Sequence, residues 1–177
     1  SYWMKHFDSI FAEETGKSVI EYMYDSSKTR SFVFDDLFYS SPAIYMTEVS
    51  LAKTLIEEGI IPDAVLGSSL GEFAAAAVAG VINEDEGLKF IISQTKLIMD
   101  KMAPGGMLAI LDKPELFEQM PELFSNLELA GINYEQHFVV AGEKRGSDEA
   151  EKALRKNRIV LIKEIPLSIF NELELYI

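Results

Sequence analysis

The chain has 177 residues, 48% of them hydrophobic, and a formal charge of -13 from 29 acidic and 16 basic residues. This is the composition of a globular protein, and its acidity disfavours binding to nucleic acid or to an anionic membrane. Without cysteine, and with only His6 and His137 as histidines, the sequence predicts no disulfide, no thiol nucleophile and no metal site. The longest apolar stretch, 73–82, is too short to span a bilayer, so we expect a cytoplasmic protein.

Up to about residue 106 the sequence predicts a helix-rich α/β arrangement. Apolar residues at steps of three and four predict a helix over 2–11, and polar residues predict a loop over 25–34. Ser41 and Pro42 are typical of a helix start with proline at the first helical position, and Gly59 ends that helix. The sequence then predicts a buried parallel strand over 63–67, a helix over 70–81 and a helix from the acidic residues 83–86 to Met102.

After Gly105 and Gly106 the pattern changes to short alternating elements. The predicted order is β-α-β-β-α-β, which is the ferredoxin-like arrangement. The expected strands are 107–111, 127–133, 137–141 and 159–167, and the expected helices are 113–124 and 148–157. We therefore predict an α/β chain divided into 1–106, 107–168 and a tail, 169–177, that returns to the first part or is unrelated to it.

A Gly-x-Ser-x-Gly motif lies between the predicted strand 63–67 and the alanine-rich helix that follows. It is typical of a nucleophile elbow, in which a serine occupies a strained turn and glycines two residues before and after leave room for it. Ser69 is the central serine, Gly67 and Gly71 flank it, and the Leu70 N–H would be the first oxyanion-hole donor. The structural alternative is a flexible turn that caps a helix. The strand-and-helix context favours catalysis.

A serine nucleophile needs a general base, and the sequence offers no obvious one. His6 falls in a helix rich in core positions, which favours a packing or surface role. His137 begins a predicted strand of the second part, where a histidine bonded to backbone is more common than a catalytic one. Glu72 is best interpreted as a helix-start or ion-pairing carboxylate.

The run from Pro62 to Val81, with its Gly-Ser-Ser-Leu-Gly-Glu core, resembles the acyltransferase domains of polyketide synthases and the malonyl-CoA:acyl carrier protein transacylases. Ser41-Pro42-Ala43, Gly105-Gly106-Met107 and Ile165-Pro166-Leu167-Ser168 resemble further motifs of that family, in order. The resemblance implies an α/β-hydrolase-like large subdomain, here partial, with a ferredoxin-like small one. It also implies that Ser69 takes an acyl group from a thioester and passes it to the phosphopantetheine of an acyl carrier protein, with no cofactor of its own.

Four departures from the family refine this expectation. Ser68 replaces the histidine before the nucleophile, and Gln94 stands where an arginine pairs with the free carboxylate of malonyl groups. The catalytic histidine expected after Ser168 and the glycine- and glutamine-rich N-terminal motif are both missing, so we expect the chain to be a fragment. Gln94, and the stretch 133–140 that contains His137 in place of the family's Asn-Ser-Pro-x-Gln-Val-Val, make the chain similar to the acyl hydrolases of polyketide systems that use free-standing acyltransferases. Ser68, Gln94 and His137 are therefore our acyl-pocket candidates.

These features leave several functions open. The first is an acyltransferase homologue of polyketide biosynthesis that hydrolyses non-carboxylated acyl groups from carrier proteins. The alternatives are an acyl-CoA or malonyl-CoA:acyl carrier protein transacylase, a noncatalytic docking domain and a general esterase, which would need a histidine later in the chain. A basic patch could dock the acidic carrier protein or be an ordinary solvated face; it comprises Lys144, Arg145, Lys152, Arg155, Lys156 and Arg158.

Overall fold

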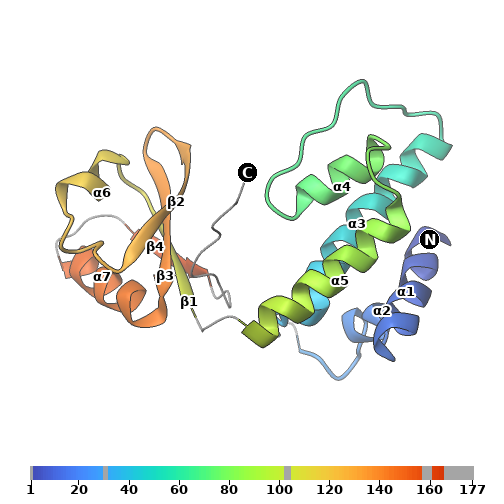
Figure 1. Ribbon diagram of the computed structural model, residues 1–177, viewed down its shortest axis with the longest axis horizontal. Coiled ribbons are helices and arrows are strands. Elements are labelled where there is room, and N and C mark those ends of the chain that lie inside the picture. The colour runs from blue at the N-terminus through green and yellow to red at the C-terminus, as the bar shows by residue number, and fades with distance from the viewer. Residues whose placement is uncertain (1, 30–31, 102–104, 157–160, 166–177) are drawn as a thin grey trace. The chain divides into compact units, whose positions relative to one another are not determined.

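The computed structural model describes residues 2–29, 32–101, 105–156 and 161–165. The chain forms two compact units, 1–99 and 100–177, which are coloured blue to green and green to red in Figure 1. The first unit is helical, whereas the second contains a sheet. Across the described ranges, no helix is both long and apolar enough to cross a membrane.

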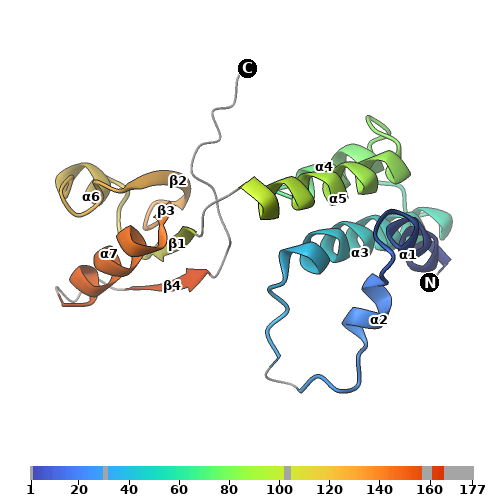
Figure 2. The same cartoon turned by 60° about the horizontal axis from the view of Figure 1, so that its bottom comes forward.

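The first unit is built around a long central helix, α3, which packs against both α1 and α4. Figure 2 shows α4 and α5 in one layer and α1 with α3 in the other. The fully buried side chains at its centre include Phe7, Phe11, Tyr45, Met46 and Leu88. The helices are α1 (Tyr2–Thr15), α2 (Val19–Met23), α3 (Leu37–Glu57), α4 (Gly71–Val78) and α5 (Glu84–Lys101).

Helix α3 begins earlier than the sequence predicted. Asp36 is its N-cap, and the Asp36 carboxylate accepts a hydrogen bond of 3.0 Å from the Phe38 N–H. Pro42 consequently lies inside the helix, buried, and not at the first helical position. A proline so close to the start removes only one bond, the one its N–H would have made to the carbonyl four residues earlier. The side-chain cap therefore decides where this helix begins.

The predicted strand over 63–67 was wrong for this structure. Residues 60–68 run without regular secondary structure from the end of α3 to the turn before α4. A strand is stabilised by hydrogen bonds to neighbouring strands, and the described part of the first unit contains only helices. The apolar side chains of the segment consequently stay exposed, and Leu66 is 99% exposed.

Polar contacts join the first unit's helices around Lys53. The Lys53 ammonium donates a hydrogen bond of 2.5 Å to Glu84 and lies 4.6 Å from the centre of the Trp3 ring. The His6 ring bonds to Asp85 over 2.8 Å and lies 5.4 Å from the Phe7 ring. The hydrogen bond from Lys53 holds the pKa of the Glu84 carboxyl below its usual value. These contacts connect α1, α3 and α5.

Replacing Glu84 with glutamine is expected to lower the free energy of unfolding by about 1 kcal/mol at pH 7, because Lys53 loses its charged partner. The pKa of Glu84 is lower in the folded protein than in the unfolded chain, where it is near 4.5. The ionised carboxylate therefore stabilises the fold above pH 4.5, and this stabilisation is lost as the pH falls through the lower, folded-state pKa. The deficit of the variant should therefore shrink in urea unfolding below pH 4. Glu86→Gln, at an exposed pair with Lys89, is the control and should show a smaller deficit. A deficit that is constant with pH would contradict the assignment.

Helices α3 and α5 also meet at Gly87. The hydroxyl of buried Tyr45 donates a hydrogen bond of 2.8 Å to the Glu84 carbonyl, and burial raises the pKa of Tyr45, which keeps this donor protonated. A Cβ atom at Gly87 would collide with the Tyr45 hydroxyl oxygen. Glycine at this position therefore lets a large aromatic side chain fill the space between the two helices.

The second unit has the β-α-β-β-α-β order that the sequence predicted. Its four strands form an antiparallel sheet in the order β2-β3-β1-β4. Leu108 and Ile110 of β1 pack with Phe138 of β3 and Leu154 of α7 in a separate core. The elements are β1 (Gly105–Ile110), α6 (Glu115–Gln119), β2 (Leu127–Tyr134), β3 (His137–Glu143), α7 (Lys144–Lys156) and β4 (Leu161–Ile165).

Two helix boundaries in the second unit differ from prediction. Helix α6 has five residues instead of the predicted span 113–124, because Pro121 forces Met120 out of the helical region, to φ -123° and ψ 56°. Helix α7 begins at Lys144, immediately after β3, and not at Asp148. The predicted tail, 169–177, lies outside the described residues.

Candidate active site

Ser69 occupies the backbone conformation expected of a nucleophile elbow. Its φ angle is 52°, and among the described residues it is the only one other than glycine with a positive φ. The left-handed region is costly for a residue with a Cβ atom, and such strain is found mainly at functional sites. Helix α4 starts two residues later, at Gly71. The elbow therefore forms in this structure although its preceding strand does not.

The two elbow glycines differ in the space around them. A Cβ atom at Gly67 would collide with the Gly71 carbonyl oxygen and with the backbone of Glu72, so only glycine fits there. A Cβ atom at Gly71 would lie 3.8 Å from both carboxylate oxygens of Glu48, which is ordinary van der Waals contact. The expectation that both glycines are needed for space holds for Gly67 alone.

Three backbone N–H groups after Ser69 donate hydrogen bonds within the turn. The N–H groups of Gly71 and Glu72 donate to the carbonyls of Ser68 and Ser69, each over 3.0 Å, and that of Phe73 donates to Leu70 over 3.2 Å. Within the described residues, the Leu70 N–H donates to no backbone carbonyl. The N–H next to the serine is thus available to an incoming oxygen, which is what an oxyanion hole requires.

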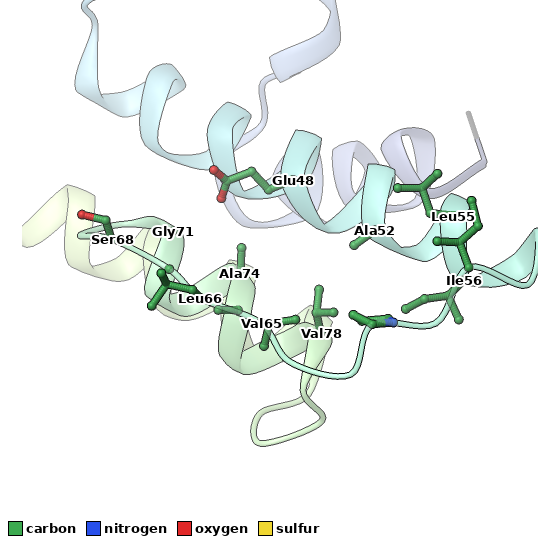
Figure 3. A pocket seen from close by; sticks show the side chains of 14 residues that line it. Glu48, Ala52, Leu55, Ile56, Val65, Leu66, Ser68, Gly71, Ala74 and Val78 are labelled. Carbon is green, nitrogen blue, oxygen red and sulfur yellow. The ribbon is translucent and has the colours of Figure 1, made fainter.

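A cavity of about 540 Å³ lies beside the elbow, between α3, α4 and the connecting segment. Gly67, Ser68 and Gly71 line one end of it, together with the Glu48 carboxylate (Figure 3). Leu55 and Ile56 lie at the opposite end, and the rest of the lining is apolar; it includes Ala52, Ile60, Pro62, Val65, Ala74 and Val78. Ser68, predicted as a pocket residue, therefore lines a cavity that is polar near the elbow and apolar beyond it.

Gln94 lies half-buried on α5. It is one turn beyond Phe90, on the same helix face, and the Phe90 ring packs 5.4 Å from that of Phe73 on α4. Phe73 is four residues after Ser69. Gln94 is therefore one turn away from a contact between α5 and α4, and it does not line the cavity beside Ser68.

The two histidines have partners of their own. The His137 ring lies in the second unit, where its Nδ1 accepts from the Asn133 side chain over 2.9 Å and the ring packs 5.0 Å from Tyr134. His6 is bonded to Asp85. Neither contact involves Ser69, so the described residues assign no base to the serine. They also contain no group of three or more histidine or acidic residues that could hold a metal.

Three of the five described residues of the predicted basic patch pair with acidic residues of their own helix, and no ion pair is found for the other two, Lys152 and Lys156. On α7, Lys144 pairs with Asp148 over 2.6 Å and Arg145 pairs with Glu149 over 2.9 Å. Arg155 pairs with Glu151 over 2.6 Å, and Arg158 lies outside the described residues. Pairing at i,i+4 is typical of a solvated helix face. This favours the solvated-face interpretation over carrier docking.

Glu48 is the site residue that sequence reasoning missed. Apolar periodicity assigns its helix to the core, and nothing in the local pattern separates an acidic residue beside a cavity from one in water. Its neighbour Gly71 comes from an element more than twenty residues later. The one available signal was an acidic residue next to Val49, within a largely apolar stretch.

Curated proteins are similar to this chain over most of its length. The chain is 46% identical over 167 residues to a polyketide biosynthesis acyltransferase homolog, PksD, of Bacillus subtilis (strain 168), and covers 51% of it. It is 40% identical over 156 residues to the homolog BaeD of Bacillus velezensis (strain DSM 23117 / BGSC 10A6 / LMG 26770 / FZB42), and covers 48% of it. These matches take in 93% and 88% of this chain, which therefore spans about half the length of the curated relatives it matches.

The fold comparison points the same way. The acyltransferase domain from module 8 of the salinomycin polyketide synthase matches with a TM-score of 0.77 and 26% identity, over 94% of this chain and 39% of that one. The family model described as "Acyl transferase domain" matches residues 2–167, almost the whole sequence. The chain belongs to the acyl transferase domain family.

Proposed function

We propose that this chain carries the nucleophile of an acyltransferase homologue of polyketide biosynthesis that removes acyl groups from acyl carrier proteins. The observation that carries the proposal is the strained φ angle of Ser69 at the start of α4. In this proposal the first unit is part of an α/β-hydrolase-like subdomain and the second is a ferredoxin-like one. The likeness to the Bacillus homologs supports the pathway class.

The chemistry follows from the elbow. The Ser69 hydroxyl attacks the carbonyl carbon of a thioester, and the Leu70 N–H binds the negatively charged oxygen that develops. Collapse of this intermediate breaks the carbon–sulfur bond and leaves an acyl-Ser69 ester. The proton of the Ser69 hydroxyl passes in net terms to the departing sulfur, which leaves as the phosphopantetheine thiol. Water then attacks the ester and releases the free acid. The phosphopantetheine belongs to the carrier protein, so the proposal needs no cofactor on this chain.

Gln94 is the reason that the proposal names acyl groups without a free carboxylate, and the resemblance to acyl hydrolases with the same replacement favours hydrolysis over transfer. An arginine would offer a charged, bidentate partner to a malonyl carboxylate, whereas glutamine is neutral. The helix position of Gln94, one turn from the contact with α4, is compatible with such a role. The second candidate, a transacylase for malonyl or other acyl groups, shares the acyl-Ser69 intermediate and differs in the acceptor. A docking domain would have no use for the strained serine.

The deciding experiment uses the full-length gene product. It is incubated separately with acetyl-carrier protein and malonyl-CoA, and both proteins are followed by intact mass. We expect an acetyl adduct that maps to Ser69, release of free acetate and no malonyl adduct. A malonyl adduct that moves to the carrier would establish the transacylase instead. The absence of both an adduct and acyl release with either donor would refute the proposal.

Replacing Gln94 with arginine is expected to raise malonyl loading of Ser69 about tenfold relative to acetyl loading, because the guanidinium supplies a counter-ion for the carboxylate. The measurement is the ratio of initial loading rates by intact mass. Gln94→Lys supplies the charge without the planar fork and should give a smaller gain. Equal loading ratios in wild type and Gln94→Arg would show that residue 94 does not contact the acyl group.

A further inference from the structure

We propose that Glu48 selects against acyl groups that end in a carboxylate, as a specificity residue of the site built around Ser69. The inference rests on the proposed acyl-Ser69 chemistry. The inference is independent of Gln94. It concerns the negative charge of Glu48, whereas the argument from Gln94 concerns the missing positive charge of an arginine.

The position of Glu48 carries the argument. Its side chain reaches from the middle of α3 to the first turn of α4, where both carboxylate oxygens lie 3.8 Å from the place a Gly71 Cβ would take. Gly71 is two residues from Ser69, so their Cα atoms are at most roughly 7 Å apart. The carboxylate also shares one end of the cavity with Ser68 (Figure 3). Ser69 does not itself line the cavity, and Glu48 is exposed to solvent. An acyl group that extends from Ser69 toward Gly71 would therefore approach a partly hydrated negative charge.

The surroundings leave this charge uncompensated. In the part of the chain that the structure describes, no lysine or arginine is ion-paired with Glu48, and it is the only charged residue that lines the cavity. Glu72, which follows Gly71 in the first turn of α4, is also acidic. An uncharged acyl chain is indifferent to these carboxylates, whereas a malonyl carboxylate is repelled.

The expected size follows from Coulomb's law. Two unit charges roughly 10 Å apart, at effective dielectric constants between about 20 and 80, change a rate ratio by about twofold to fifteenfold. Because part of the path between the charges is open to water, added salt should weaken the effect.

The test is a competition between acetyl- and malonyl-carrier protein for the full-length gene product, with the ratio of kcat/KM values read from free-acid release. Glu48→Gln should raise the malonyl:acetyl ratio by about twofold to fifteenfold. Glu48→Asp, which keeps the charge, should change the ratio less. Glu58→Gln removes the same charge at the end of α3, outside the cavity, and should leave the ratio unchanged. An unchanged ratio in Glu48→Gln, or an equal change in Glu58→Gln, overturns the proposal.

Two further measurements distinguish a failure of this inference from misfolding of the variant and from a failure of the proposed function. In the wild-type protein, raising the salt concentration should raise the malonyl:acetyl ratio, and a ratio that is insensitive to salt counts against Glu48 even if Glu48→Gln fails to fold. In Ser69→Ala, which cannot form the ester, Glu48→Gln should strengthen the binding of malonyl-pantetheine but not of acetyl-pantetheine. Failure of acylation at Ser69 with intact binding discrimination would refute the proposed function alone.

Discussion

Replacing Ser69 with alanine is expected to lower the rate of acyl release from the carrier protein by at least about a thousandfold, in the range found when other serine nucleophiles are removed. The loss should be this large because water must then attack the thioester directly, without an ester intermediate. The measurement is free-acid release from acetyl-carrier protein by the full-length gene product, together with the mass of the protein.

The matched control for this change is Ser9→Ala. Ser9 is exposed on α1, and its hydroxyl bonds only to the His6 carbonyl of its own helix, over 2.6 Å. This variant should release acid at the wild-type rate. A Ser69→Ala protein that still releases acid within about tenfold of wild type would show that the chemistry does not pass through this serine.

Replacing Gly67 with alanine is expected to have the second largest effect. The added Cβ would overlap the Gly71 carbonyl and the Glu72 backbone, none of which is the end of a flexible side chain. The turn must therefore shift, and we expect a destabilisation of about 1 to 3 kcal/mol together with a loss of acyl release of about a hundredfold. Urea unfolding measures the first quantity and free-acid release measures the second.

Gly71→Ala is the comparison that makes this prediction specific. The same methyl group at Gly71 meets only the Glu48 carboxylate, at contact distance, so the loss of activity should be much smaller than at Gly67. Equal losses of activity in Gly67→Ala and Gly71→Ala would mean that the elbow requires the backbone freedom of glycine at both positions. The lack of space at Gly67 would then not explain the result.

The fold could be predicted wherever local patterns decide it. Periodicity located α1, α3, α4 and α5 but not the five-residue α2, and alternation located β1, β2 and β3, because each of the located elements has its own apolar face. The start of α3 was missed because Asp36 caps it from outside the apolar pattern. The strand at 63–67 was wrong because an apolar run indicates only a tendency, and pairing with other strands decides whether a strand forms.

The site was predictable in its local part only. The motif fixed Ser69 and the sharp turn, and the structure adds the reason that Gly67 is indispensable. Glu48 could not be found, because its proximity to Gly71 depends on how α3 packs against α4. Contacts between distant elements of this kind leave no trace in the spacing of either element.

The contact between Tyr45 and Gly87 has a consequence for sequence variation. Alanine at 87 overlaps the Tyr45 hydroxyl, whereas phenylalanine at 45 removes the overlapping oxygen along with its bond to the Glu84 carbonyl. A second substitution at 45 therefore changes the effect of the first at 87, so the two are not additive. Across homologues that keep this helix pair, the residues at 45 and 87 should covary, and a redesign of either helix has to treat them as one unit.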